Sequence, residues 1–257
     1  MITNELNTAQ RQLEQLLADC SSAVAFTGAG ISTESGIPDF RSPGSAWKRH
    51  PPMPFSDFLA SEENRILTWQ RKFIMDDSYA GAKPNRGHRA ISRLVADGTI
   101  GAVITQNIDG LHQFSGVPAH QVIELHGNGT YAACLDCGLR YELAPIRKKF
   151  EADGRAPVCS TCGGPVKGAT IAFGQAMPGE AMRRAQAAAG ACDLMLAIGS
   201  SLVVYPAAGF PLLAKENGAQ LVIINRDPTP LDEYADLIVR GEIGAVLEPF
   251  ERANRLN

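Results

Sequence analysis

The chain has 257 residues, of which 45% are hydrophobic and 20% are charged, and its formal net charge is −3 at pH 7. This composition is ordinary for a folded globular protein and argues against a largely disordered chain. A nearly neutral chain is a poor candidate for a non-specific nucleic-acid binder, which needs a basic face, and no apolar run reaches the ~18 residues of a membrane span. Because the first residues form no basic and apolar leader, we expect a cytoplasmic protein that binds neither nucleic acid nor membrane.

Short apolar segments recur along the chain and predict strands that are covered on both faces. They occupy residues 22–27, 100–105, 121–125, 193–198, 220–225 and 236–240. Helical spacing of apolar residues appears between them, at residues 7–19, 86–96, 179–191 and 207–217. Strands that are apolar on nearly every residue and alternate with helices are typical of a parallel sheet. The predicted fold class is therefore α/β, with a Rossmann-like parallel sheet and helices on both of its faces.

Two segments interrupt this alternation. Residues 42–84 begin with several prolines and continue with a helical pattern of apolar residues, so we expect a loop followed by a helical insertion. Residues 128–170 hold two cysteine pairs and many glycines, which predicts a small module inserted into the sheet domain.

Four of the six cysteines form two closely spaced pairs. Two residues lie between Cys134 and Cys137 and two between Cys159 and Cys162, and 21 residues lie between the pairs. Each Cys-x-x-Cys turn can direct two thiolates at one ion, and two such turns complete the tetrahedron that Zn²⁺ prefers. We expect one structural zinc, since four thiolates leave no coordination position open for catalysis.

A glycine-rich turn follows the first predicted strand. In Gly28-Ala-Gly-Ile-Ser32 the glycines would let a phosphate approach the backbone at a helix N-terminus. The dehydrogenase fingerprint also needs a third glycine, where Thr33 stands, and an acidic residue about 20 positions later, where Met53 and Pro54 stand. The turn predicts a dinucleotide site without hydride transfer, and a plain strand-to-helix turn is the alternative.

Polar residues also follow the other predicted strands, where the binding crevice of an open α/β sheet lies. His126 closes an apolar strand and precedes a glycine, so we expect its ring to project into that crevice. His88 and His112 lack this placement, and we expect structural roles for them.

Six motifs occur together and in order, and through them the chain resembles a sirtuin, a Sir2-type NAD-dependent protein deacylase of the bacterial type. They are Gly28-Ala-Gly-Ile-Ser32, Pro38-Asp-Phe-Arg41, Thr105-Gln-Asn-Ile-Asp-Gly-Leu-His112, Glu124-Leu-His-Gly127, the two Cys-x-x-Cys pairs and Gly199-Ser-Ser201. The resemblance runs from about residue 20 to about residue 248, nearly the whole chain.

The resemblance implies a single catalytic domain over residues 1–257. Its Rossmann-like NAD-binding part would comprise residues 20–41, 85–127 and 171–248, with a helical insertion at 42–84 and a zinc-binding module at 128–170. It also implies NAD as co-substrate, one structural zinc per chain, and acyl-lysine proteins or peptides as substrates. The acyl group, acetyl by default, would pass to ADP-ribose as nicotinamide is released.

The resemblance also implies a role for each matched residue. The pyrophosphate of NAD would be bound by Gly28, Ala29, Gly30 and Ser32. Its nicotinamide end and the adjoining ribose would be bound by Ile37, Asp39, Phe40, Arg41, Gln106, Asn107, Ile108 and Asp109. Its adenosine half would be bound by Gly199, Ser200, Ser201, Asn225 and Ile243. The catalytic residues would be His126, as the general base, with Asn107 and Asp109.

Two positions depart from the sirtuin pattern. Gln175 stands where a glutamate usually borders the substrate groove. Desuccinylase-type members carry a Tyr-x-x-Arg pair that holds the acyl carboxylate, and here Thr68 and Arg71 stand in those places. An arginine can pair with a carboxylate bidentately, and a solvated helix-face charge is the other interpretation of Arg71. We therefore expect neutral acyl groups to be preferred over succinyl.

Two other functions remain open on the sequence alone. An ADP-ribosyltransferase or NAD hydrolase on the same scaffold would use the NAD site but would not need His126 as a base. A non-catalytic module that senses NAD or another metabolite would not need Asn107, Asp109 and His126 at all.

Overall fold

The computed structural model describes residues 2–39 and 51–252. Its larger part is a seven-stranded sheet in the order β1-β10-β9-β8-β2-β3-β4, in which every neighbouring pair is parallel. The strands are β1 (Ile2–Thr3), β2 (Ala23–Thr27), β3 (Ile100–Thr105), β4 (Val122–Glu124), β8 (Leu194–Ile198), β9 (Gln220–Ile224) and β10 (Leu237–Val239). The predicted α/β class with a parallel sheet is confirmed.

The central strands are almost entirely apolar because both of their faces are covered. In β2, Ala23 and Ala25 pack into one hydrophobic cluster, whereas Val24 and Phe26 pack into another on the opposite face. All five residues of this strand are buried. Continuous apolar character is what a strand needs when neither face meets water.

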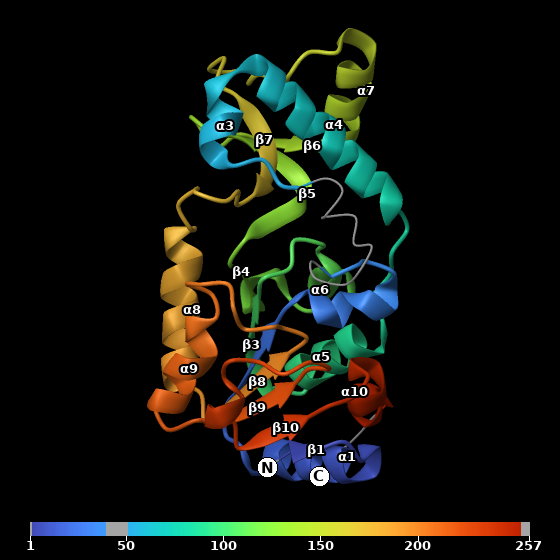
Figure 1. The fold of residues 1–257 in the computed structure, drawn as a ribbon, viewed down its shortest axis with the longest axis vertical. Helices are drawn as coiled ribbons and strands as arrows, with labels where there is room; N and C mark the ends of the chain where they lie inside the picture. The colour runs from blue at the N-terminus through green and yellow to red at the C-terminus, as the bar shows by residue number, and fades with distance from the viewer. Residues whose placement is uncertain (1, 40–50, 253–257) are drawn as a thin grey trace.

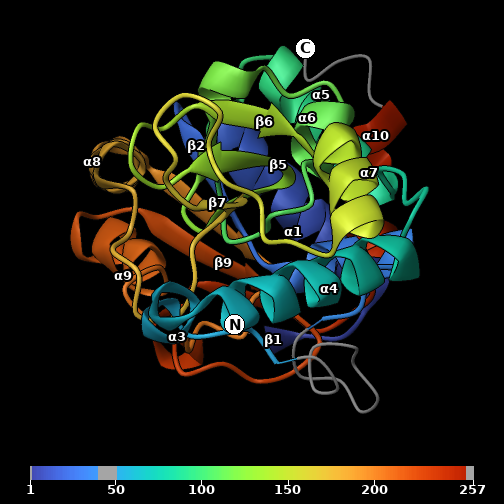
Figure 2. The ribbon, with the colours of Figure 1, turned by 90° about the horizontal axis from the view of Figure 1, so that it is seen from above.

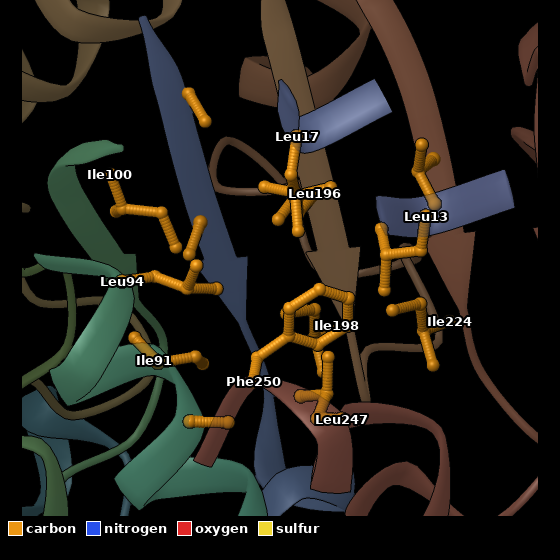
Figure 3. Close-up of a cluster of buried hydrophobic side chains, with 14 of the residues drawn as sticks. Leu13, Leu17, Ile91, Leu94, Ile100, Leu196, Ile198, Ile224, Leu247 and Phe250 are labelled. Carbon is orange, nitrogen blue, oxygen red and sulfur yellow. The ribbon is translucent and has the colours of Figure 1, made fainter. Parts of the chain in front are cut away.

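Helices cover both faces of the sheet. On one face lie α1 (Leu6–Asp19), α5 (Arg86–Ala96) and α10 (Ile243–Arg252). Figure 3 shows Leu13 of α1, Phe250 of α10 and Ile198 of β8 among the side chains of this cluster. On the other face lie α8 (Gly179–Ala191) and α9 (Gly209–Glu216).

A second, antiparallel sheet lies at one end of the long axis (Figure 1). Its three strands are in the order β6-β5-β7. They are β5 (Gly127–Cys134), β6 (Arg140–Glu142) and β7 (Val166–Thr170). Figure 2 shows α4 (Glu62–Ser78) and α7 (Leu143–Asp153) beside this sheet. Trp69 and Phe73 of α4 and Phe150 of α7 share one core with β5 and β7, so the helical insertion and the cysteine-bearing segment form one small body.

The insertion contains two helices. The short helix α3 (Phe55–Ala60) is separated from α4 by Ser61, whose backbone is extended and whose hydroxyl accepts a hydrogen bond from the Asn64 N–H. Ser61 thus caps α4, which has two glutamates in its first turn.

Two elements of the larger sheet domain were not expected from the sequence. The strand β1 is only two residues long, and α10 contains Pro249, which is unusual inside a helix. The remaining short helices are α6 (Leu111–Phe114) and the 3₁₀ turns η1 (Ala29–Ser35), η2 (Ala119–Gln121) and η3 (Asp232–Tyr234). Within the described parts of the chain, none of the helices combines the length and apolar character required to cross a bilayer.

Candidate active site

Residues predicted from the sequence meet at the carboxyl ends of five neighbouring strands. Gly28 follows β2, Gln106 follows β3, His126 lies just past β4, Gly199 follows β8 and Asn225 follows β9. The strand β2 pairs with β3 on one side and with β8 on the other, and the chain progresses outward from both. This is the topological switch point of the sheet, where open α/β sheets bind their ligands.

Gly28 and Gly30 pack directly against the loop that follows β8. The Gly30 N–H donates to the Gly199 carbonyl oxygen at 2.8 Å. A Cβ atom on either glycine would lie 2.8 Å from that same oxygen. Both positions therefore require glycine for contact between two backbone segments, whether or not a phosphate approaches them. The turn continues into η1, so the helix expected after it is a 3₁₀ helix over its whole length.

Ser32, Asn107 and Asp109 form one hydrogen-bonded group beside this loop. The Ser32 hydroxyl donates to Asp109 Oδ2 at 2.7 Å, and Asn107 Nδ2 donates to Ser32 Oγ at 3.2 Å and to the Gly28 carbonyl at 3.1 Å. Burial raises the pKa of Asp109, and hydrogen bonds from the Leu111 N–H and from Ser32 oppose that shift. Three residues predicted for the nicotinamide end and the pyrophosphate are thus held in fixed positions.

The ring of His126 is held through one nitrogen. Its Nδ1 lies 3.0 Å from the carbonyl oxygen of Gln106. Since a carbonyl oxygen only accepts hydrogen bonds, Nδ1 carries the proton in the neutral ring and Nε2 carries the lone pair. Burial lowers the pKa of His126, and the hydrogen bond to Gln106 partly opposes this. The arrangement provides a neutral imidazole with a basic Nε2 at neutral pH.

Gln106 also ties two loops of the site together. Its side-chain Nε2 donates to Ser200 Oγ at 2.8 Å, which joins the loop after β3 to the loop after β8. Its backbone N–H donates to the Thr27 carbonyl at 3.0 Å. The carbonyl that orients His126 is therefore itself well anchored.

His126 lies at the junction of the two sheets, because β4 ends before it and β5 begins after it. The Ile171 N–H donates to the His126 carbonyl oxygen at 2.8 Å. Gly127 has a φ of +71°, and a Cβ atom there would lie 2.0 Å from the Ala169 carbonyl oxygen. Only glycine combines this left-handed backbone with so close an approach of β7.

A buried polar layer beneath the site was not singled out from the sequence. The Thr27 hydroxyl donates to Thr105 Oγ1 at 2.8 Å and lies 2.9 Å from His112 Nε2. Thr105 Oγ1 in turn accepts from the Asn107 N–H at 3.0 Å. Burial lowers the pKa of His88 to about 4 and that of His112 to about 3, so both rings are neutral. The sequence feature that could have indicated this layer is the threonine, Thr27 or Thr105, that ends each of two largely apolar strands.

The other predicted NAD contacts surround this group. Phe40 and Arg41 lie outside the described residues. Ile37 and Ile243 are buried, and Ile243 packs in the hydrophobic cluster that also contains Ile31. Half-buried in the loops around the switch point are Ala29, Asp39, Ile108, Ser201 and Asn225.

The four paired cysteines converge in the small body. The Sγ atoms of Cys134, Cys137, Cys159 and Cys162 all lie within 4.8 Å of one another. Two of the separations, Cys134–Cys162 and Cys137–Cys159, are 3.4 and 3.6 Å. A Zn–S bond of about 2.3 Å gives a tetrahedron edge of about 3.8 Å, so this set of donors fits zinc. The Tyr141 hydroxyl donates to Cys159 Sγ at 3.1 Å and supports one corner of the tetrad.

Polar side chains gather at the switch point of a parallel sheet, and a separate module holds four cysteines. These two features place this chain among the nucleotide-binding α/β proteins. More narrowly, the chain belongs to the Sir2 family, whose model matches residues 28–206. An NAD-dependent protein deacetylase of Rhodopseudomonas palustris is 57% identical to it, over 97% of this chain and 99% of that protein. NAD-dependent protein deacetylase 1 of Bradyrhizobium diazoefficiens is 55% identical, over 97% and 98% of the two chains.

Solved structures of the family share the fold over nearly the full length. A Sir2 complex with a p53 peptide and NAD+ matches with a TM-score of 0.82 and 35% identity, over 95% of both chains. A Sir2 structure bound to a propionylated peptide matches with a TM-score of 0.81 and 34% identity, over 93% of this chain and 96% of that one.

Proposed function

We propose that this chain is an NAD-dependent protein lysine deacylase that acts mainly as a deacetylase. One observation carries the proposal: His126 lies at the carboxyl ends of the strands, and the Gln106 carbonyl holds its Nδ1, which leaves Nε2 as the basic nitrogen. The full-length similarity to NAD-dependent protein deacetylases supports the same reaction. Acyl-lysine peptides are the substrate class, as in the solved complexes with acetylated and propionylated peptides.

The donor set in the crevice suits a dinucleotide. Gly28, Ala29, Gly30 and Ser32 would lie along the pyrophosphate. The Gly28 and Gly30 N–H groups donate to the Ile198 and Gly199 carbonyls, so the Ala29 N–H would be the amide of this turn that meets the phosphates. Asp109 with Ile108 would hold the nicotinamide carboxamide. Gln106 and Asn107 would contact the adjoining ribose, and the loops after β8 and β9 would receive the adenosine half. Bound NAD supplies an electrophilic ribose carbon, a nicotinamide leaving group and ribose hydroxyls.

His126 would act on the ribose hydroxyls. Its Nε2 would accept a hydroxyl proton, which activates that oxygen toward the acyl carbon of the substrate lysine. Burial favours the neutral ring and so keeps the base ready at neutral pH. Asn107 and Asp109 would fix the nicotinamide end, since both are tied to Ser32.

The competing functions fit less well. An NAD hydrolase or ADP-ribosyltransferase needs no imidazole base at this position, and a sensing module needs none of the hydrogen-bonded group. Both relatives named above are deacetylases. A sensing module would also leave unexplained why a backbone carbonyl orients the ring of His126.

The proposal includes one structural zinc, bound by the four cysteines of the small body. The ion would close the loops around β5 and β7 and would take no part in the reaction, since all its ligands are protein thiolates. We also propose a cytoplasmic location, because reduced cysteines are required to bind the metal.

The domain organisation follows the proposed chemistry. We assign the NAD-binding part to residues 20–41, 85–127 and 171–248, the helical insertion to 42–84 and the zinc module to 128–170, within one catalytic domain.

Mass spectrometry of the reaction tests the proposal. The purified chain is incubated with an acetyl-lysine peptide and NAD, and peptide, nicotinamide and acetyl-ADP-ribose are quantified together. A deacylase yields the three products in equal amounts. A transferase yields a peptide heavier by ADP-ribose, a hydrolase yields nicotinamide with unchanged peptide, and a binding module yields none of these.

A further inference from the structure

Lys72 of α4 links the helical insertion to the strand that leaves His126. Its Nζ donates to the Asp76 carboxylate, at 2.8 Å to Oδ1 and 2.7 Å to Oδ2, and to the Gly129 carbonyl oxygen at 2.8 Å. The Lys72 side chain is only 16% exposed. Because Asp76 follows Lys72 by one helical turn, the ammonium is oriented by its own helix before it reaches β5.

The aliphatic part of Lys72 lies in a slot that β7 leaves open. A Cβ atom on Gly168 would lie 3.4 Å from Lys72 Cε and 3.5 Å from Cδ. The side chain therefore packs along the bare backbone of Gly168. This packing distinguishes Lys72 from a solvated surface lysine, whose stem would be free to move.

Gly129 connects Lys72 to the Ile108-Asp109 segment of the site. Its carbonyl accepts from Lys72, and its N–H donates to the Ile108 carbonyl oxygen at 2.7 Å. A Cβ atom on Gly129 would lie 3.0 Å from that same Ile108 oxygen. The next residue, Asp109, is held by Ser32. A continuous set of contacts thus leads from α4 to the two residues proposed to hold the nicotinamide carboxamide.

The charges at the end of α4 support this proximity. Tyr79, the residue that follows α4, is half-buried, and its pKa is raised by burial and then by the charges of Asp76 and Asp109. The charges of Asp76 and Asp109 therefore both act on the C-terminal end of α4.

We propose that Lys72 is a positioning residue for the nicotinamide side of the active site. It holds Gly129, and Gly129 holds the Ile108 carbonyl, so the Ile108-Asp109 segment keeps the geometry that receives nicotinamide. The proposal rests on the proposed deacylase function and on the role proposed there for Ile108 and Asp109. Lys72 itself touches neither the peptide nor the reacting atoms.

The test compares nicotinamide-dependent and peptide-dependent constants. In Lys72→Met the stem over Gly168 stays while the ammonium is lost. We expect the inhibition constant of nicotinamide and the KM of NAD to rise about tenfold, the size of effect found for residues that act through others. The KM of the acetyl peptide should stay within twofold. Isotope exchange between labelled nicotinamide and NAD should weaken together with nicotinamide inhibition.

Arg147→Met is the matched control. Arg147 also contacts α4, through both carboxylate oxygens of Asp77 and over the Phe73 ring, but it makes no contact with Gly129 in the described structure. It should lower the melting temperature and leave the nicotinamide constants unchanged. Gly129→Ala provides a second route if Lys72→Met does not fold, because the added methyl displaces the Ile108 carbonyl. It should raise the nicotinamide inhibition constant in the same way.

Three outcomes would overturn the proposal. The first is a Lys72→Met enzyme that is less stable but has unchanged nicotinamide inhibition. The second is an equal shift in Arg147→Met, which would make the effect a general loosening of the small body. The third is a folded Gly129→Ala enzyme with unchanged nicotinamide inhibition. These are separate from failure of the proposed function, which would show as a wild-type chain that does not deacylate peptide with NAD.

Discussion

The Nδ1 atom of His126 lies 3.0 Å from the carbonyl oxygen of Gln106, and this contact decides which ring nitrogen is basic. The carbonyl can only accept, so the proton sits on Nδ1 and the lone pair on Nε2. Gln106 is in turn fixed by Thr27 through its backbone and by Ser200 through its side chain. The orientation of the proposed base is thus determined by the sheet itself.

The lowered pKa of His126 predicts the acid limb of the pH profile. The neutral ring is the active form, so activity is lost as pH falls through the pKa, and a lowered pKa moves this loss downward. We expect the acid midpoint of kcat/KM to lie below 6.5, the ordinary value for histidine. His88 and His112, with pKa values of about 4 and 3, should not titrate above about pH 5.

An NMR titration of the His126 ring tests whether this residue causes the loss of activity at acid pH. The ring resonance and kcat/KM should share one midpoint, which separates His126 from the Asp109 carboxyl, whose pKa is raised by burial. A kinetic midpoint at or above 6.5 would contradict the predicted environment of the base.

Zinc removal should unfold the small body. We expect metal analysis to give one zinc per chain, and chelation to lower the melting temperature, because binding of a structural zinc is coupled to folding. Cys134→Ser should lose the metal. Cys20→Ser is the matched control, since its thiol is half-buried, lies outside the tetrad and donates to the nearby Leu17 carbonyl. Full zinc retention in Cys134→Ser would argue against the tetrad as the site.

Trp69 should stabilise the zinc module although it belongs to the insertion. Its indole N–H donates to the Val166 carbonyl of β7 at 3.1 Å, and the side chain is 1% exposed. Trp69→Phe leaves that carbonyl unpaired, which costs about 1–3 kcal/mol, and should accelerate zinc loss. Ile74→Ala, on the exposed side of the same helix, should change neither stability nor zinc retention. Equal behaviour of the two variants would refute a shared core.

The acyl preference should favour acetyl over succinyl. Arg71 donates to the Pro51 carbonyl at 2.8 Å, and the Thr68 hydroxyl donates to the Asn64 carbonyl at 2.8 Å, so both side chains are occupied by nearby backbone. A succinyl carboxylate would be left with unpaired acceptor positions at a cost of ~1–3 kcal/mol, or about tenfold to hundredfold in kcat/KM.

Parallel assays with acetyl and succinyl forms of one peptide measure this ratio. Thr68→Tyr, which adds the missing phenol hydroxyl, should raise the relative efficiency on the succinyl form. A wild-type preference for succinyl would mean that Arg71 leaves Pro51 and binds the acyl carboxylate.

The sheet and its crevice followed from the sequence for a definite physical reason. Strands such as β2 are buried on both faces, so they contain no polar interruption before Thr27. Polar residues then appear just where each strand ends, and parallel strands bring those ends to one edge. The grouping of Ser32, Asn107 and Asp109 was expected from this rule, whereas the hydrogen bonds between them required the structure.

The sequence did not predict that the helical insertion and the cysteine-bearing segment share one hydrophobic core. The apolar face of α4 signals that Trp69 and Phe73 are buried, but not that their partner is Phe150, at ring-centroid distance 5.6 Å from Phe73. Helical periodicity fixes which side chains share a face and carries no information on what covers it. For the same reason the contact of Lys72 with Gly129 appears only in the structure.

Replacement of His126 by alanine tests the central claim most directly. Deacetylation turnover and NAD affinity are measured on the same preparation of His126→Ala, with circular dichroism to establish that it folds. The account predicts that turnover falls by about 10²–10⁴-fold, the usual contribution of a general base, while NAD binds with wild-type affinity. Turnover close to that of the wild-type chain would contradict the assignment of His126 as the base.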